Sequence, residues 1–171
     1  LSDLAAAAAY FENWQLGNHA VNYLSASNAP TIVQHYWSLS VEEQFYLVWP
    51  LLILATTTVA RRVHRAQVDN WLVLVLGLTA VGSFVTSVLW TSSDPTVAFF
   101  ATPVRAWEFA AGGLVAVKFR ALQRQSERLR AIASWLGLVI VCFAMFALSR
   151  HSSFPGALAL LPVGGATMVV A

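Results

Sequence analysis

Long apolar stretches separated by short polar connectors make up most of the chain. No Asp, Glu, Lys or Arg occurs in residues 44–60, 70–93, 131–149 or 151–171. A helix needs about 20 mostly apolar residues to cross roughly 30 Å of hydrocarbon. The last three stretches meet that length, and the first meets it when extended back to Ser40. The pattern therefore predicts several membrane-spanning helices.

We expect an all-α fold, a polytopic transmembrane helix bundle with polar connectors such as residues 12–37. The chain begins at Leu1 and ends within an apolar run, so we interpret it as an internal fragment of one transmembrane domain. Its partners would include the lipid bilayer and further helices of the same protein on both sides. The predicted spans are 1–11 (partial), 40–60, 71–90, 95–117, 131–148 and 156–171 (partial).

Two helix starts carry local signals. Ser40 followed by Glu43 fits a capping box, which predicts that the span over 40–60 begins at Ser40. The span over 95–117 carries its start signal twice, at Asp94-Pro95 and at Thr102-Pro103. Arg105 would lie about 15 Å into a helix that begins at the first signal and about 5 Å into one that begins at the second.

The composition supports a membrane protein. Hydrophobic residues make up 58% of the chain, and its 18 charged side chains (Lys+Arg 10, Asp+Glu 8) are fewer than half of the ~25% typical of soluble domains. Mean hydropathy is +0.64. This composition excludes a disordered chain, a disulfide-stapled secreted module and a nucleic-acid binder, which need more polarity, more Cys or more clustered base.

The basic residues predict an orientation. Loop 61–70 holds three Lys or Arg and loop 118–130 holds five, so eight of the ten lie in two connectors. The positive-inside rule places both loops in the cytoplasm. We expect a multi-pass protein of the plasma (inner) membrane, with residues 12–37, 91–98 and 149–156 facing outward.

A first polar cluster lies at the start of the span over 40–60. Glu42, Phe45, Tyr46 and Trp49 fall on one face of a helix, and Glu43 points about 100° away. A carboxylate at the edge of a membrane span is a candidate functional group. The structural alternative is that both carboxylates simply favour the positive end of the helix dipole.

A second polar cluster lies within the span over 95–117. Arg105 and Glu108 are i, i+3 neighbours, and Gly112-Gly113 would let another helix approach closely. We expect Arg105 to pair with Glu42 or Glu108 across a polar cavity that opens outward. The alternative is a self-contained ion pair that only orders the bundle.

The two clusters resemble the acyltransferase family 3 of integral membrane acyltransferases. The family pattern His-aromatic-Trp-Ser-Leu-x-Val-Glu-x-Gln-Phe-Tyr-Leu-x-Trp-Pro matches residues 35–50, and Thr-x-x-Arg-x-Trp-Glu-x-x-x-Gly matches residues 102–112. A weaker likeness covers residues 154–164, which resemble members that carry an appended extracytoplasmic SGNH-type domain. The resemblance thus covers most of the chain.

The resemblance implies an enzyme of about ten helices that moves an acyl group, usually acetyl from acetyl-CoA, to a hydroxyl of a cell-envelope glycan. The family's catalytic histidine lies in its first transmembrane helix. No histidine of this chain occupies that position, so the residues carried over have supporting roles. The four histidines are His19, His35, His64 and His151.

The site residues follow from the matched positions. Glu42 and Arg105 are assigned supporting catalytic roles, Glu42 by orienting the histidine or binding acceptor hydroxyls and Arg105 by supplying positive charge. The residues expected to line the cavity or bind the acceptor are His35, Trp37, Ser38, Gln44, Tyr46 and Glu108. No set of residues has the spacing of metal ligands.

A secondary transporter or flippase for a polar or lipid-linked substrate is the alternative function. It would also account for buried charges in spans interrupted by Gly and Pro. Many transporters contain an internal repeat, however, and the two polar clusters share no spacing.

Overall fold

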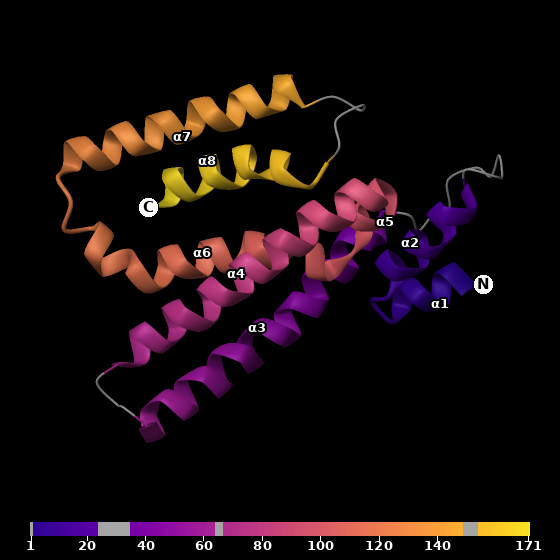
Figure 1. Ribbon diagram of the computed structural model, residues 1–171, viewed down its shortest axis with the longest axis horizontal. Helices are drawn as coiled ribbons and strands as arrows, with labels where there is room; N and C mark the ends of the chain where they lie inside the picture. The colour runs from indigo at the N-terminus through magenta and orange to yellow at the C-terminus, as the bar shows by residue number, and fades with distance from the viewer. Residues whose placement is uncertain (1, 24–34, 64–66, 149–153) are drawn as a thin grey trace.

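The computed structural model describes residues 2–23, 35–63, 67–148 and 154–171. Every regular element within these ranges is helical, which confirms the predicted all-α class. In Figure 1 the short helices α1 (Ser2–Ala8), α2 (Glu12–Tyr23) and α5 (Pro95–Phe100) gather at one end, and the longer helices extend toward the other.

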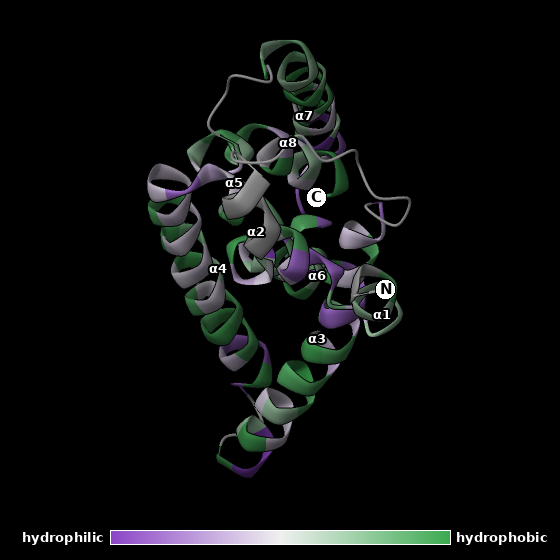
Figure 2. Cartoon of the chain, turned by 90° about the vertical axis from the view of Figure 1, so that its right-hand side faces the viewer, coloured by the Kyte–Doolittle hydropathy of each residue, from purple (hydrophilic) through white to green (hydrophobic). Residues whose placement is uncertain are grey.

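Three helices within the described ranges are long and apolar enough to cross a membrane: α3 (Tyr36–Val63), α4 (Val68–Ser93) and α7 (Glu127–Ala147). Most of their apolar side chains are exposed on the outside of the bundle. Figure 2 shows these helices mainly in the hydrophobic colour, whereas hydrophilic segments lie around α2, α6 and the beginning of α3. An outer surface of this kind suits contact with lipid.

Helix α3 begins at Tyr36, four residues before the predicted start. The capping-box prediction at Ser40 is wrong, because the Ser40 Oγ donates to the carbonyl oxygen of Tyr36 at 3.0 Å within the helix. Pro50 lies inside α3, which continues through it.

The N-terminal region is more helical than predicted. The chain turns between α1 and α2 at Tyr10, whose φ is 57°. The polar loop predicted over 12–37 is therefore a helix as far as Tyr23, and residues 24–34 lie outside the described ranges. Glu12 and Asn13 of α2 misled the sequence interpretation, because both are buried within the protein and the sequence does not show their neighbours in space.

The single span predicted over 95–117 is two helices, α5 and α6 (Thr102–Leu122). Both start signals are used. The Asp94 carboxylate accepts from the amides of Thr96 and Val97 at 3.1 and 3.0 Å and caps α5. Ala101 then adopts an extended conformation (φ −76°, ψ 121°), and α6 starts with Pro103 in its first turn. We call residues 99–102 the elbow.

Helix α4 packs closely against α6 through a buried serine. The Ser83 Oγ donates to the carbonyl oxygen of Pro103 at 2.6 Å and accepts from the amide of Trp107 at 2.9 Å. These two groups stand four residues apart and are the ones that an α-helix pairs with each other. The Ser83 hydroxyl therefore bridges one turn of α6 and attaches it to α4.

The C-terminal helix α8 (Leu160–Val170) lies beside α7 (Figure 1). The two backbones meet at Gly137 and Gly165: a Cβ built on Gly165 would lie 2.8 Å from the Gly137 carbonyl oxygen. A short 3-10 turn, η2 (Ala157–Ala159), precedes α8. Just before it, the amide of Gly156 donates to the Thr91 Oγ1 at 3.0 Å and ties this turn to α4.

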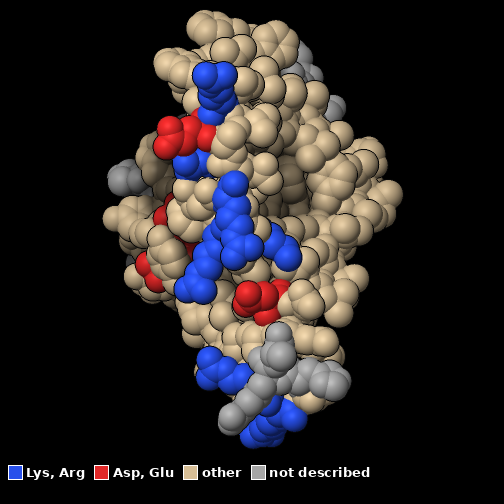
Figure 3. Space-filling model, turned by 90° about the vertical axis from the view of Figure 1, so that its left-hand side faces the viewer, with Lys and Arg blue, Asp and Glu red and all other residues tan. Residues whose placement is uncertain are grey.

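Basic residues collect at the end of the bundle opposite to α1, α2 and α5. The connection from α6 to α7 and the C-terminal end of α3 both lie there (Figure 1). Figure 3 looks onto that end and shows Lys and Arg side chains gathered across it. The described basic residues of these two segments are Arg61, Arg62, Lys118, Arg120, Arg124, Arg128 and Arg130.

Candidate functional site

Arg105 is the centre of the most highly charged interior part of the described structure. It lies in the first turn of α6, and its side chain is only 15% exposed. The guanidinium donates from Nε and Nη2 to the carbonyl oxygen of Phe99, at 3.3 and 3.2 Å. Its Nη1 lies 3.7 Å from the Glu108 Oε2, and the Glu108 side chain is 21% exposed.

Aromatic rings enclose the Arg105 guanidinium. Its Cζ lies 5.5 Å from the ring centroid of Trp37 and 5.1 Å from that of Phe99. Trp37 also packs against Phe99 and Phe100, with centroids 5.0 and 5.2 Å away, and Phe154 lies 6.4 Å from Phe99. A cation over aromatic faces is stabilised by the ring quadrupoles, by about 0.5–2 kcal/mol per contact. The guanidinium is thus held in one orientation.

The structure answers the question of which carboxylate pairs with Arg105. Glu108, on the same helix, forms the ion pair, and it is one of the two partners that the sequence predicted for Arg105. Glu42 is exposed on α3, and no ion pair links it to Arg105 among the described residues. The pairing is therefore local to α6 and does not run across a cavity between two helices.

Gln44 belongs to a hydrogen-bonded ring of three side chains. Its Nε2 donates to the Asn13 Oδ1 at 2.9 Å, and its Oε1 accepts from the Thr102 Oγ1 at 2.6 Å. The Asn13 Nδ2 closes the ring by donating to the Thr102 Oγ1 at 3.0 Å. Asn13 is fully buried, and sequence reasoning missed it because residues 12–37 looked like a polar loop.

The remaining predicted residues lie at the start of α3. His35, Ser38 and Tyr46 are exposed, and the Ser38 Oγ donates to the carbonyl oxygen of His35 at 3.4 Å. Trp37 is half-buried against Arg105. The structure thus brings Trp37, Arg105 and Glu108 together and leaves His35, Ser38, Glu42 and Tyr46 on the surface of this chain.

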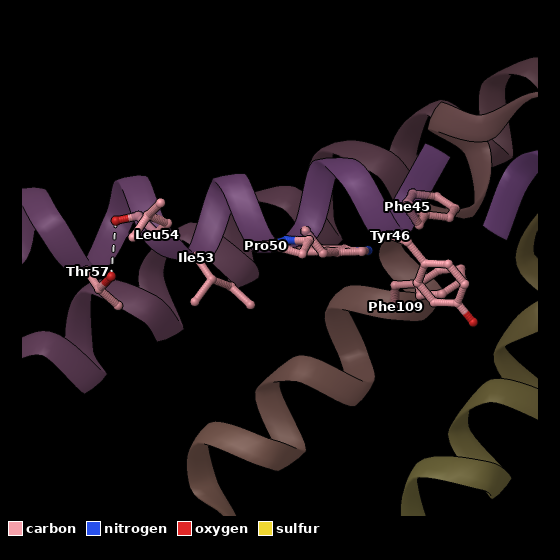
Figure 4. A pocket seen from close by; sticks show the side chains of 8 residues that line it. Phe45, Tyr46, Pro50, Ile53, Leu54, Thr57 and Phe109 are labelled. Atoms are coloured by element: carbon pink, nitrogen blue, oxygen red, sulfur yellow. Dashed lines mark hydrogen bonds between the residues drawn. The ribbon is translucent and has the colours of Figure 1, made fainter. Parts of the chain in front are cut away.

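Several cavities flank α6, and two of them adjoin predicted site residues. A groove of about 590 Å³ lies between α3 and α6, with Tyr46 and Phe109 at one end and Thr57 near the other (Figure 4). Its lining residues are Phe45, Tyr46, Trp49, Pro50, Ile53, Leu54, Thr57 and Phe109. A pocket of about 390 Å³ lies on the α8 side of α6, and its lining includes Glu108, Gly112, Phe154 and Thr167.

Glu108 connects the ion pair to the second cavity. Its Oε2 faces Arg105, and its Oε1 is shielded from solvent and has no hydrogen-bond partner among the described residues. A shielded carboxylate oxygen of this kind is an acceptor for a hydroxyl or an N–H donor. In the described ranges, no three His, Cys, Asp or Glu side chains lie close enough to hold a metal ion.

Comparisons with known proteins agree with the two motifs. Residues 4–171 match a family model described as an acyltransferase domain. The peptidoglycan O-acetyltransferase OatA of Listeria monocytogenes is 29% identical over 181 residues, which cover 98% of this chain and 28% of the relative. A Bacillus subtilis protein named "Putative peptidoglycan O-acetyltransferase YrhL" is 30% identical over 122 residues, 70% of this chain and 18% of that protein.

The chain spans less than a third of the length of these relatives. No solved structure matches it.

Proposed function

Because this chain belongs to the acyltransferase family, whose model matches residues 4–171, we propose that it forms part of a membrane enzyme that acylates a glycan. The acyl group is acetyl, the donor is acetyl-CoA or another acyl-CoA, and the acceptor is a hydroxyl of a cell-envelope glycan. The observation that carries the proposal is the Arg105 guanidinium, held by Phe99 and Trp37 and paired with Glu108, which lines the α6–α8 pocket.

Acyl transfer needs positive charge where the thioester carbonyl becomes an oxyanion. The acceptor oxygen attacks the carbonyl carbon, its proton passes to a base, and the carbon–sulfur bond breaks to release the thiol of coenzyme A. Arg105 supplies the positive charge in this scheme, since its guanidinium is permanently protonated and already oriented. The base is the histidine that the family resemblance places in another helix.

Glu108 and the exposed start of α3 bind the acceptor. Glu108 lines the α6–α8 pocket, where its carboxylate accepts a hydrogen bond from a sugar hydroxyl. Glu42 lies one helix away at the surface and, as a supporting residue, binds further hydroxyls or orients the histidine. His35, Ser38 and Tyr46 extend the same exposed end of α3 and line the approach of the glycan.

The enzyme is a multi-pass protein of the plasma membrane, with its basic end (Figure 3) in the cytoplasm. The start of α6, which carries Arg105, then lies near the outer face, where a cell-envelope glycan is found. The rest of the protein supplies further helices and, as in the family members that residues 154–164 resemble, an SGNH-type domain. Neither the family match nor the named relatives support a transporter or flippase.

Transfer of labelled acetyl groups tests the proposal. The complete enzyme in membrane vesicles receives radiolabelled acetyl-CoA and a glycan with free hydroxyls, and label on the glycan is counted. Wild-type enzyme transfers label, whereas Arg105→Ala and Glu42→Gln variants transfer at least tenfold less. Arg120→Ala, at the basic end of α6, is the matched control and retains activity.

Three results would contradict parts of this proposal. Wild-type vesicles that never label the glycan would refute the function. Full activity of the Glu42 and Arg105 variants would refute the residue roles. Movement of the glycan across the vesicle membrane without covalent change would favour the transporter.

A further inference from the structure

The ring of Asn13, Gln44 and Thr102 joins three helices that are distant in sequence. Asn13 comes from α2, Gln44 from α3 and Thr102 from the first residue of α6. The Asn13 Nδ2 also donates to the carbonyl oxygen of Phe100 at 3.1 Å, and the Gln44 Nε2 to that of Tyr10 at 2.8 Å. The ring is therefore also hydrogen-bonded to the backbone of two other segments, at Phe100 and at Tyr10.

Each side chain in the ring has its full set of donors in use. The Asn13 and Gln44 amides each donate two hydrogen bonds and accept one, and the Thr102 hydroxyl donates one and accepts one. A buried amide with all partners in place has one favourable orientation, because a flip would set like groups against each other. The hydrogen bonds of the ring therefore fix where its three side chains lie relative to one another and to the backbone.

That position is the elbow between α5 and α6. Phe100 and Thr102, the two elbow residues that Asn13 contacts, flank Ala101, where the helical conformation is interrupted. The carbonyl oxygen of Phe99, one residue before Phe100, is the group that holds the Arg105 guanidinium. Asn13 and Arg105 thus bind the carbonyl oxygens of two adjacent residues, Phe100 and Phe99.

Apolar packing alone does not require Asn13. Beneath the elbow, Ala98, Ala101 and Val104 form a buried apolar cluster against Trp14 of α2. This cluster holds α2 near α5 without any hydrogen bond. Burying an amide costs free energy unless its hydrogen bonds are made. Because the apolar cluster already holds α2 beside α5, we expect the buried Asn13 to set the orientation of the elbow relative to α2.

We propose that Asn13 is a positioning residue that, through its hydrogen bonds to Phe100 and Thr102, fixes the elbow and so aims the Arg105 guanidinium at the reacting carbonyl group. The inference rests on the proposed function for the role of Arg105. Its physical basis is that a positive charge stabilises an oxyanion only from the right place, and a 1 Å displacement costs about 100-fold in rate.

The test compares isosteric and truncated variants of the complete enzyme in vesicles. Asn13→Asp keeps the shape but replaces the donating amide with an oxygen that faces the Phe100 carbonyl oxygen, and Asn13→Ala removes the group. Thr56→Val is the matched control, because it deletes a buried hydroxyl whose hydrogen bond, to the Leu52 carbonyl oxygen at 2.8 Å, stays within α3. Each is made alone and together with Arg105→Ala.

The expected kinetic result is a fall in kcat of about 10- to 100-fold for both Asn13 variants, with a smaller change in KM. In the Arg105→Ala background the same Asn13 substitutions cost little more, since the group that they misplace is already gone. Thr102→Ser, which keeps the hydroxyl of the ring, retains activity. Thr56→Val leaves kcat unchanged in both backgrounds.

A second readout does not depend on activity. Phenylglyoxal modifies accessible arginine side chains, and mass spectrometry measures how fast the peptide containing Arg105 reacts. We expect faster modification of Arg105 in the Asn13 variants than in wild type or Thr56→Val. If wild-type enzyme transfers no acetyl group, the proposed function fails, and this readout still decides whether Asn13 positions Arg105.

Three outcomes would overturn the inference. The first is an Asn13 substitution that lowers kcat by the same factor in the Arg105→Ala background as in wild-type enzyme, because the two residues would then act independently. The second is unchanged reactivity of Arg105 toward phenylglyoxal. The third is a fall in the amount of folded enzyme large enough to account for the whole loss of activity, which would make Asn13 a purely structural residue.

Discussion

The close contact between α7 and α8 allows two adjacent glycines to be compared directly. A Cβ on Gly165 would lie 2.8 Å from the Gly137 carbonyl oxygen and 2.8 Å from the Val141 Cγ2, whereas a Cβ on Gly164 would meet nothing within 4 Å. Overpacking a tight contact costs about 1–3 kcal/mol, and the backbone oxygen cannot rotate away. Replacing a helical glycine by alanine otherwise stabilises by about 0.5–1 kcal/mol.

We therefore expect opposite signs for the two variants. Gly164→Ala raises the free energy of unfolding slightly, and Gly165→Ala lowers it by up to about 2 kcal/mol, the overpacking cost less the helix-propensity gain. Because both variants add the same methyl group to the same helix, the difference between them isolates the contact with α7.

Thermal stability of the complete enzyme in detergent provides the assay. Samples of wild type and both variants are heated over a range of temperatures, and the fraction that stays monodisperse in size-exclusion chromatography gives an apparent Tm. A lower Tm for Gly165→Ala and an equal or higher Tm for Gly164→Ala is expected. Equal shifts in the two variants would refute the close packing of α7 on α8.

Three further substitutions test the packing around α4 and the Arg105 site. Ser83→Ala should destabilise the enzyme by about 1–3 kcal/mol, because it removes both hydrogen bonds to α6, whereas Ser87→Ala, a buried serine with no partner among the described residues, should leave the apparent Tm unchanged. Arg105→Lys keeps the charge but not the planar group that donates twice to one carbonyl oxygen, so acetyl transfer should fall at least tenfold in the labelling assay. Thr91→Val removes the acceptor for the Gly156 amide and should lower stability by about 1 kcal/mol, and an unchanged Tm would show that the turn before α8 does not depend on this bond.

The site lies where α6 starts and not in the middle of a helix. Arg105 uses its Nε and Nη2 donors on the carbonyl oxygen of Phe99, which has no α-helical partner because the residue four positions later, Pro103, carries no N–H. The break at Ala101 allows the aromatic side chains before it to fold over the guanidinium.

Local features of the site were accessible from sequence. Arg105 and Glu108 pair because residues three apart share a helix face, so their contact needed no knowledge of the fold. Asp94-Pro95 and Thr102-Pro103 both marked helix starts, because proline acts within one turn. Asp94 caps α5 as predicted, whereas the N-cap of α6 is Ala101 and the Thr102 hydroxyl bonds to Gln44 instead. The sequence did not indicate that both signals were used.

Sequence reasoning failed where side chains distant in the chain decide the structure. It expected Gly112 and Gly113 both to let another helix approach, yet a Cβ on Gly113 would lie 3.3 Å from the Leu76 Cδ1 of α4 and one on Gly112 would meet nothing within 4 Å, because the packing of α4 selects the face. It interpreted residues 12–37 as loop, since the buried partners of α2 lie elsewhere. It also could not place Glu42, whose exposure depends on how α3 is oriented.

The sequence by itself determined the helical class, the apolar spans, the basic end and the family, because these depend on composition, periodicity and motifs that act over short distances. Tertiary structure alone decided the elbow and the ring that holds it. Asn13 bonds to residues 87 and 89 positions away, and such a contact exists only once several helices have packed together. Whether a polar residue is a solvated loop side chain or a buried hydrogen-bonding group depends on its neighbours in space, which the order of residues along the chain does not reveal.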